Sequence, residues 1–159
     1  MTSRSFRPCR ALIACVALGA TAAAVADPHT PAERAIHYRH SVYHVIEWNV
    51  TAMGNAVKGK SPYNPTDFSL RAARVATLVP MLLEGFPPGS YVEGHTLAKP
   101  SIWTDRATFE SLLTKLGTRS EALVEVAKGG DLATIKPAFN DLVQTCNECH
   151  KKFKEKDDD

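Results

Sequence analysis

The chain has 159 residues, and its 19 Lys and Arg nearly balance its 17 Asp and Glu, which leaves a formal net charge of +2 at pH 7. This balance excludes a strongly basic surface of the kind that binds nucleic acid. The length fits one domain built around one hydrophobic core.

Residues 1–26 have the pattern of an export signal and are not expected to belong to the fold. The segment starts with three positive residues, Arg4, Arg7 and Arg10. An apolar run follows at 11–25, and a small-x-small cleavage site lies at 24–26. The run is shorter than the roughly 20 residues of a membrane span. Cleavage after Ala26 removes three arginines and changes the formal charge from +2 to −1. A lipoprotein site at 12–15 is the weaker alternative, because almost no apolar run precedes it.

The first predicted helix runs from Pro31 to Val57. Thr30 is the expected N-cap, Pro31 occupies the first helical position, and Glu33 completes a capping box. The apolar residues recur at steps of mostly three and four, which predicts one buried stripe. The stripe consists of Ile36, Tyr43, Ile46, Val50, Met53 and Val57.

A second helix is predicted after a proline-punctuated connection, with Thr66 or Asp67 as its cap. Its apolar positions are Phe68, Leu70, Ala72, Val75, Leu78 and Val79. Pro80 should disrupt it. The stretch 84–99 is rich in Gly and Pro and lacks a helical period. Loops of this length in compact domains are usually functional or held by another group.

The third predicted helix runs from Ser101 or Thr104 to Lys128, and Gly129-Gly130 ends it. Its inward residues are Phe109, Leu112, Leu113, Leu116, Leu123 and Val126.

The fourth predicted helix starts with Asp131 as its N-cap and has the most regular spacing in the chain. Its inward residues are Leu132, Ile135, Phe139, Leu142, Cys146, Cys149 and Phe153. Pro137 should kink it, because a proline in a helix removes a backbone hydrogen bond. No alternating run is long enough for a sheet. The sequence therefore predicts an all-α, antiparallel up-and-down four-helix bundle over residues 27–159.

The last predicted helix carries the motif Cys146-Asn147-Glu148-Cys149-His150 near its end. This CxxCH spacing is typical of covalent haem attachment, in which two thiols form thioethers and the histidine binds the iron. Both cysteines lie on the inward stripe, and His150 follows Cys146 by one helical turn. The motif predicts one covalently attached haem c, with His150 as an axial ligand of the iron.

Two other interpretations of the cysteine pair are weaker. A zinc site would need further ligands, yet the only other cysteines, Cys9 and Cys15, lie in the predicted signal peptide. A thioredoxin-like redox pair would be expected near the start of a helix, where the helix dipole lowers a thiol pKa. An oxidising compartment with haem-ligation machinery, such as a bacterial periplasm, suits the remaining pair.

Several segments resemble the cytochrome c′ family in sequence. In that family the CxxCH motif also lies near the C-terminus. The family's Tyr-Arg-Gln-Ser segment resembles Tyr38-Arg39-His40-Ser41 of this chain. Its Ala-Lys-Pro-Glu-Ile-Trp segment resembles residues 98–103, and the start of its last helix resembles 130–132 and 138–139. The resemblance covers nearly all of residues 27–159 and implies the same bundle around a covalent haem.

The resemblance also implies roles for individual residues. His150 would bind the iron on one side, with no protein ligand opposite. Arg39 would pair with a haem propionate, and His40 stands where the family usually has Gln. Tyr43 corresponds to the residue on the distal side of the haem in the family, where its ring would cover the open face of the iron. Lys154 replaces a family Arg on the proximal side, which keeps the charge and loses the planar fork.

We therefore predict a periplasmic haem protein that binds small gases, nitric oxide and carbon monoxide, at a five-coordinate iron. An electron-transfer cytochrome with redox partner proteins is the alternative. The sequence shows no set of nucleophile, acid and base at a spacing that would indicate an enzyme. The family commonly pairs through the first helix, so a homodimer is expected, with Val42, Val45 and Trp48 at the contact.

Overall fold

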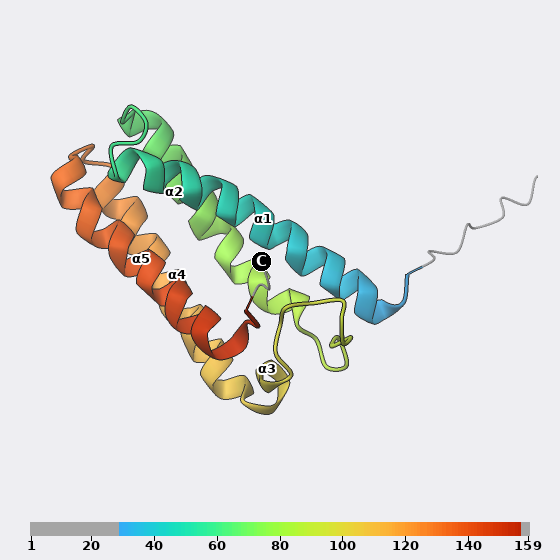
Figure 1. Ribbon diagram of the computed structural model, residues 1–159. Helices are drawn as coiled ribbons and strands as arrows, with labels where there is room; N and C mark the ends of the chain where they lie inside the picture. Colours follow the sequence, from blue (N-terminus) through green and yellow to red (C-terminus); the bar gives the residue numbers. More distant parts are fainter. Residues whose placement is uncertain (1–28, 157–159) are drawn as a thin grey trace, which may run out of the picture.

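The computed structural model describes residues 29–156, so the predicted signal peptide and its cleavage site lie outside the described part. Four long helices dominate it (Figure 1). The elements are α1 (Pro31–Val57), α2 (Pro65–Leu78), the 3-10 helix η1 (Val79–Gly85), α3 (Ser101–Thr104), α4 (Arg106–Ala127) and α5 (Leu132–Phe153). Residues 29–156 contain no β-strand beyond one isolated bridge. The all-α prediction is confirmed.

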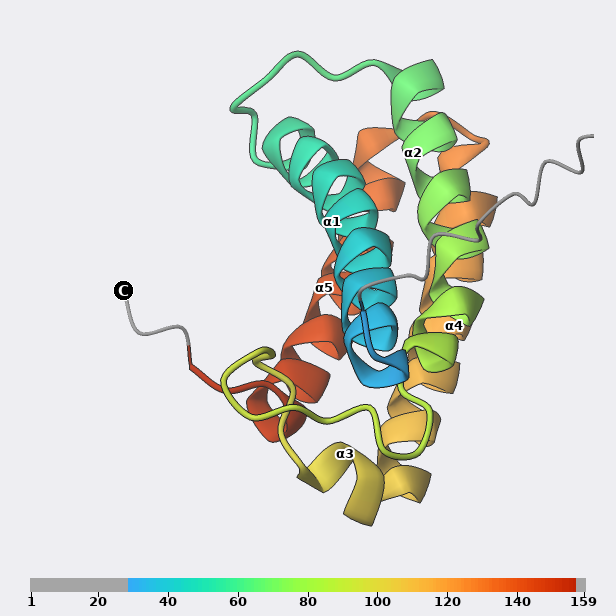
Figure 2. The same ribbon diagram turned by 90° about the vertical axis from the view of Figure 1, so that its right-hand side faces the viewer.

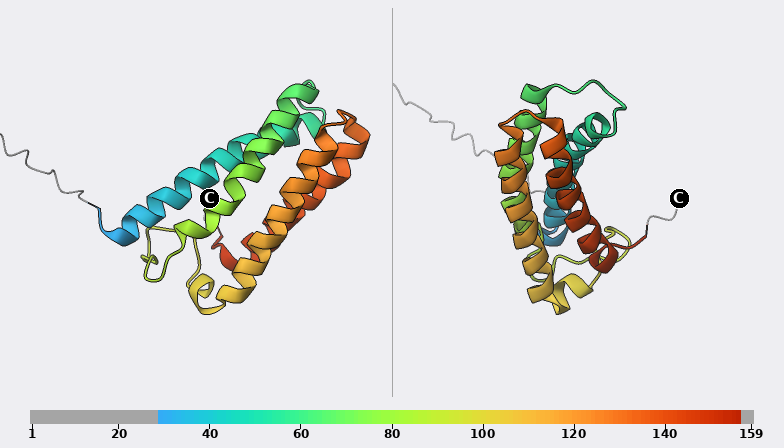
Figure 3. Two further views of the ribbon diagram at one scale, coloured as in Figure 1. Left: turned by 180° about the vertical axis from the view of Figure 1, so that it is seen from behind. Right: turned by 90° about the vertical axis from the view of Figure 1, so that its left-hand side faces the viewer.

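The two helical hairpins, α1–α2 and α4–α5, lie side by side and spread apart towards one end (Figure 3). At the closed end the two hairpin turns meet, and the Tyr63 hydroxyl donates to the Gly130 carbonyl over 3.0 Å. At the open end, the segment between η1 and α4 crosses below the bundle near the end of α5 (Figure 2). No helix among residues 29–156 is both long and apolar enough to cross a membrane.

The start of α1 has the predicted capping box. The Glu33 amide donates to Thr30 Oγ1 over 3.2 Å, and the Thr30 amide donates to Glu33 Oε2 over 2.7 Å. Two backbone donors that the helix leaves unpaired are thus satisfied.

The predicted cap of the second helix is wrong by two or three residues. Asn64 is the cap, and its Oδ1 accepts a hydrogen bond of 3.0 Å from the Asp67 amide. Pro65 explains the shift, because proline suits the first helical position and leaves the residue before it extended. Leu70, expected in the core, is 49% exposed. The α-helix ends before Pro80 as predicted, since α2 ends at Leu78 and the chain continues as the 3-10 helix η1 to Gly85.

The third predicted helix is divided. Asp105 breaks it into α3 and α4 with backbone angles of φ −117° and ψ 50°, which are not helical. The Asp105 carboxylate lies 2.6 Å from the Lys152 ammonium of α5, so the break faces the end of the last helix. The α5 helix begins after Asp131 as predicted and continues through Pro137.

The core fills the space between the hairpins. Its fully enclosed apolar residues include Met53, Phe68, Val75, Leu82, Phe109, Leu123, Ile135 and Leu142. They come from every long helix, so burying them holds the two hairpins together, at about 1.5–3 kcal/mol for each large side chain.

Candidate functional site

The CxxCH motif lies in the last turns of α5, at the open end of the bundle. Cys146 and Cys149 are partly buried free thiols on the inward side of the helix, between Leu142 and Phe153. Burial raises the pKa of both, and for Cys149 burial together with the neighbouring Cys146 raises the pKa to about 11. A redox-active pair needs a lowered thiol pKa, so this environment disfavours the thioredoxin-like interpretation.

Tyr43 of α1 lies on the side of the bundle that faces these cysteines. Burial raises the pKa of its phenol, and Cys149 and Cys146, which lie within electrostatic range of the hydroxyl, raise it further. The ring also meets Phe86 edge-on, with 6.4 Å between the centroids. The structure therefore brings together three residues that the sequence assigned to one haem pocket.

Arg39, one turn before Tyr43, is only 1% exposed although it carries a charge. Its Nη1 donates to the carbonyl oxygens of Gly85 and Ser90, each over 3.0 Å. The guanidinium carbon also lies over the Phe86 ring, 4.8 Å from the centroid. Aromatic and carbonyl groups thus surround the cation and fix its orientation.

Two nitrogens of this buried guanidinium, Nε and Nη2, have no hydrogen-bond partner among the described residues. Burial lowers the pKa of Arg39, although an arginine stays charged in proteins. A buried cation ordinarily needs an anionic partner. A haem propionate is such a partner, so the residues present fit the predicted cofactor.

Gly85 and Ser90 hold Arg39 in place, and the sequence did not reveal them. A Cβ atom at Gly85 would lie 2.5 Å from Arg39 Cβ, so only glycine lets η1 approach α1 this closely. Ser90 is fully buried, and its hydroxyl donates to the Pro87 carbonyl over 2.7 Å. The Pro87-Pro88-Gly89 turn just before Ser90 was the available signal.

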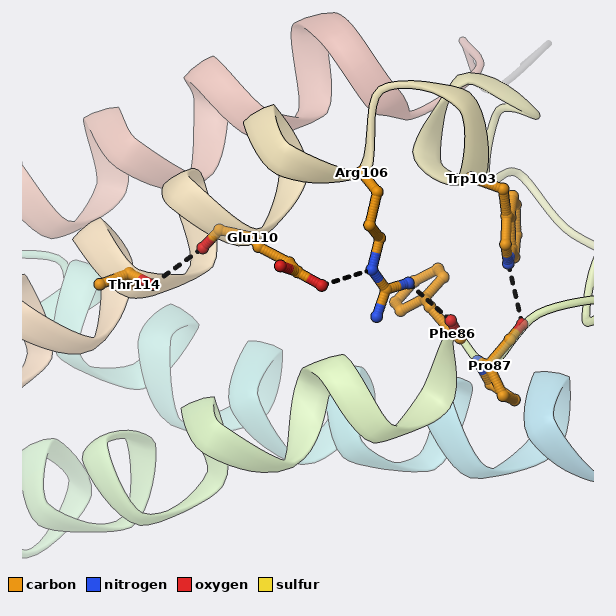
Figure 4. A network of polar contacts seen from close by, with 6 residues as sticks. All are labelled: Phe86, Pro87, Trp103, Arg106, Glu110 and Thr114. Atoms are coloured by element: carbon orange, nitrogen blue, oxygen red, sulfur yellow. Dashed lines mark hydrogen bonds and ion pairs between the residues drawn. The ribbon is translucent and has the colours of Figure 1, made fainter.

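A second set of contacts surrounds the loop after η1, in which Arg106 joins Phe86 to Glu110 (Figure 4). The Arg106 Nη1 donates to the Phe86 carbonyl over 2.6 Å, and the Trp103 indole donates to the Pro87 carbonyl over 2.9 Å. Arg106 also pairs with Glu110 at 2.7 Å. These bonds hold the loop after η1 against α3 and α4, and the Phe86 ring at its start contacts both Arg39 and Tyr43.

The end of α5 is tied to the same loop. The Lys99 amide donates to the Phe153 carbonyl over 2.9 Å, and the Glu155 amide donates to the Leu97 carbonyl over 2.7 Å. An isolated antiparallel bridge joins Ala98 and Lys154 between them. Lys154, the predicted proximal residue, is therefore held by its backbone beside the last turn of the motif helix.

His150 is exposed on the last turn of α5, and its carbonyl accepts from the Lys154 amide over 2.9 Å. His40 is also exposed and lines a surface groove with His37 and His95. Partial burial lowers the pKa of His40, and the neighbouring Arg39, His44 and His37 lower it further. Its predicted contact with a propionate stays a prediction.

This combination defines a class of protein: a helical bundle that ends in CxxCH, with a buried arginine and an aromatic ring opposite the cysteines, is a c-type haem protein. The model of the cytochrome c′ family matches residues 34–154. A cytochrome c′ from Rubrivivax gelatinosus is 34% identical over 122 residues, covering 77% of this chain and 95% of the relative. The chain belongs to the cytochrome c′ family and carries a covalently attached haem c.

Solved structures agree. Cytochrome c prime from Shewanella frigidimarina is similar with a TM-score of 0.76 and 37% identity, over 80% of this chain and 99% of that one. A nitric oxide complex of a variant of cytochrome c prime from Alcaligenes xylosoxidans is similar with a TM-score of 0.74 and 27% identity, over 80% and 98% of the two chains. The four-helix prediction is confirmed.

Different residues of the site would hold different parts of the haem. Cys146 and Cys149 supply the two sulfur atoms for attachment, and the His150 imidazole is the predicted axial ligand. Arg39 offers two unpaired donors to a propionate. When bound, the haem supplies an iron to which a small ligand can bind. Tyr43 and Phe86, whose rings meet edge-on, would form an aromatic wall beside a bound haem.

Proposed function

We propose that this protein is a periplasmic gas-binding cytochrome c′ whose five-coordinate iron takes up nitric oxide and carbon monoxide. The observation that carries the proposal is the position of Tyr43 on α1, where its ring meets Phe86 edge-on and its hydroxyl lies within electrostatic range of Cys146 and Cys149. A tyrosine phenol is ordinarily protonated at physiological pH, and burial raises the pKa of Tyr43 further. A neutral phenol is a poor iron ligand, so Tyr43 covers the distal face without coordinating.

The chemistry of such a site selects small neutral molecules. An open iron position behind an aromatic ring discriminates by steric access and by distal polarity. Among the similar structures, a nitric oxide complex and a carbon monoxide complex have been solved for variants of the Alcaligenes xylosoxidans protein. We infer a binding or buffering role against nitric oxide rather than catalytic turnover.

Electron transfer to redox partner proteins is the second candidate, and it gains weight if a protein side chain binds the sixth iron position. Met53 of α1 is 1% exposed in the core among the other apolar side chains. It follows Tyr43 by ten residues, about 15 Å along the helix. His44 of α1 is exposed. Neither position favours ligation, which supports the gas-binding proposal.

Absorption spectra of the ferric and ferrous protein, before and after carbon monoxide is added, test the proposal. We expect high-spin five-coordinate spectra and a shift of the ferrous Soret band on ligand addition. A low-spin spectrum in the absence of ligand would show a sixth protein ligand and favour electron transfer instead.

A homodimer through α1 is part of the proposal, with one correction to the contact residues. Val42 is buried within the protomer, so it is not available to a partner. Val45 and Trp48 are 48% and 73% exposed. Burying this exposed tryptophan would stabilise a pair of α1 helices. Sedimentation across a dilution series should show a dimer that dissociates on dilution, whereas monomer at every concentration would contradict it.

A further inference from the structure

A histidine-rich groove lies at the start of α1, apart from Arg39 and the cysteines. Its volume is about 440 Å³, and it is lined by His29, Glu33, Ile36, His37, His40, Gly94 and His95. Three separate stretches contribute imidazoles, namely the residue before the N-cap of α1, the first turns of α1, and the loop between η1 and α3. The predicted haem site uses His40 at most, so this concentration of imidazoles needs its own explanation.

The strongest feature of the groove is the spacing of two imidazoles. The ring centroids of His29 and His37 are 4.7 Å apart, with 59° between the ring planes. Consider two imidazoles bound to one ion with metal–nitrogen bonds of about 2.1 Å. Their ring centres lie roughly 4.5 Å apart when the nitrogen–metal–nitrogen angle is a right angle, and roughly 5.2 Å apart when that angle is tetrahedral. The observed separation falls within this interval.

The surroundings of this pair suit a cation. The Glu33 carboxylate makes the electrostatic potential of the groove more negative. Hydrogen bonds with Thr30 are the main cause of its lowered pKa, and the nearby His29 and His95 lower that pKa further. His40 follows His37 by three residues and lines the same groove. No group of three or more His, Cys, Asp or Glu in residues 29–156 is already arranged to hold a metal, so the site rests on the pair.

We propose that the groove binds one divalent transition-metal ion, with His29 and His37 as its two protein ligands and water completing the coordination. Imidazole nitrogen suits Ni²⁺, Cu²⁺ and Zn²⁺, whereas Mg²⁺ and Ca²⁺ prefer oxygen. The bound ion would clamp the residue before the N-cap of α1 onto the second turn of the helix. The site is separate from the haem iron and does not depend on the proposed gas binding.

Calorimetric titration of the untagged, haem-loaded protein with NiCl₂ tests the proposal. We expect one Ni²⁺ ion per chain, and both His29→Asn and His37→Asn should weaken binding at least about tenfold. His44→Asn is the matched control, because His44 is an exposed α1 histidine that does not line the groove. Its affinity for Ni²⁺ should equal that of the parent.

Three results would overturn the proposal. The parent protein could release no binding heat with Ni²⁺. Affinity could survive in His29→Asn or in His37→Asn, which would remove the pair from the site. Alternatively, His44→Asn could weaken binding as much as His37→Asn, which would assign the ion to the His40 and His44 pair, spaced by four residues on α1. An unchanged Soret spectrum in each variant shows that the fold and haem are intact.

Discussion

The two ends of the bundle are built in different ways. At the closed end the contacts are mainly apolar, as in the edge-on pair of Phe68 and Phe139, whose centroids lie 6.2 Å apart, and one buried nitrogen, Nη1 of Arg71, lacks a partner within residues 29–156. At the open end a buried arginine keeps two unpaired nitrogens, and two partly buried thiols face a tyrosine. The closed end is stable through its own packing, whereas the open end is arranged for a group that the polypeptide does not supply.

The largest expected effect on stability comes from a substitution that disrupts packing at the closed end alone. Phe139→Ala removes a buried ring that contacts Phe68 and approaches Gly54, and should lower the free energy of unfolding by about 3–5 kcal/mol. Carbon monoxide affinity should stay within about twofold, because the cavity lies away from the motif. Denaturant unfolding and a carbon monoxide titration measure the two quantities. A large loss of affinity would show that the two ends are not independent.

The next effect tests the open end. Arg39→Met keeps the bulk of the side chain but removes the charge, and should destabilise the haem-loaded protein by about 3 kcal/mol, since the propionate would lose its partner. Arg71→Met is the control at the closed end, where the Arg71 side chain is 19% exposed, pairs with Asp67 at 2.7 Å and has one buried nitrogen without a partner among the described residues. Its expected cost is about 1 kcal/mol or less. Equal losses in denaturant unfolding would contradict a special role for Arg39.

A smaller effect concerns the backbone that supports Arg39. Gly85→Ala places a methyl group against Arg39 Cβ and should cost about 1–3 kcal/mol. Gly117→Ala in α4 is the matched control, because its new methyl group would lie 3.9 Å from Val79. Helix propensity should make that variant more stable by about 0.5–1 kcal/mol. Changes of the same sign, measured by thermal unfolding, would show that close approach at Gly85 is unimportant.

Local sequence patterns predicted the helices well because their causes are local. The capping box at Thr30, the cap at Asp131 and the regular stripe of α5 depend on residues a few positions apart, and the structure reproduces them. The third helix was predicted to start at Ser101 or Thr104; α4 starts at Arg106, close to the later of these, and the separate short helix α3 was not predicted. The cap at Asn64 could have been found, since Pro65 marks the first helical position.

The site shows the same limit. The motif and the resemblance indicated Arg39, Tyr43, Cys146 and Cys149, and the structure places the Tyr43 hydroxyl within electrostatic range of the two cysteines. Gly85 and Ser90 could not be assigned from spacing, because their roles depend on how η1 packs against α1. The roles of all these residues towards a haem stay predictions, as do those of His40, Lys154 and His150.

The central claim is that Tyr43 controls access to an open iron site, and the carbon monoxide affinity of the ferrous protein tests it most directly. Tyr43→Ala should raise the affinity at least about tenfold, because the obstructing ring is lost. Tyr43→Phe keeps the ring and should remain close to the parent, which separates bulk from the hydroxyl. An unchanged affinity in Tyr43→Ala would contradict the account.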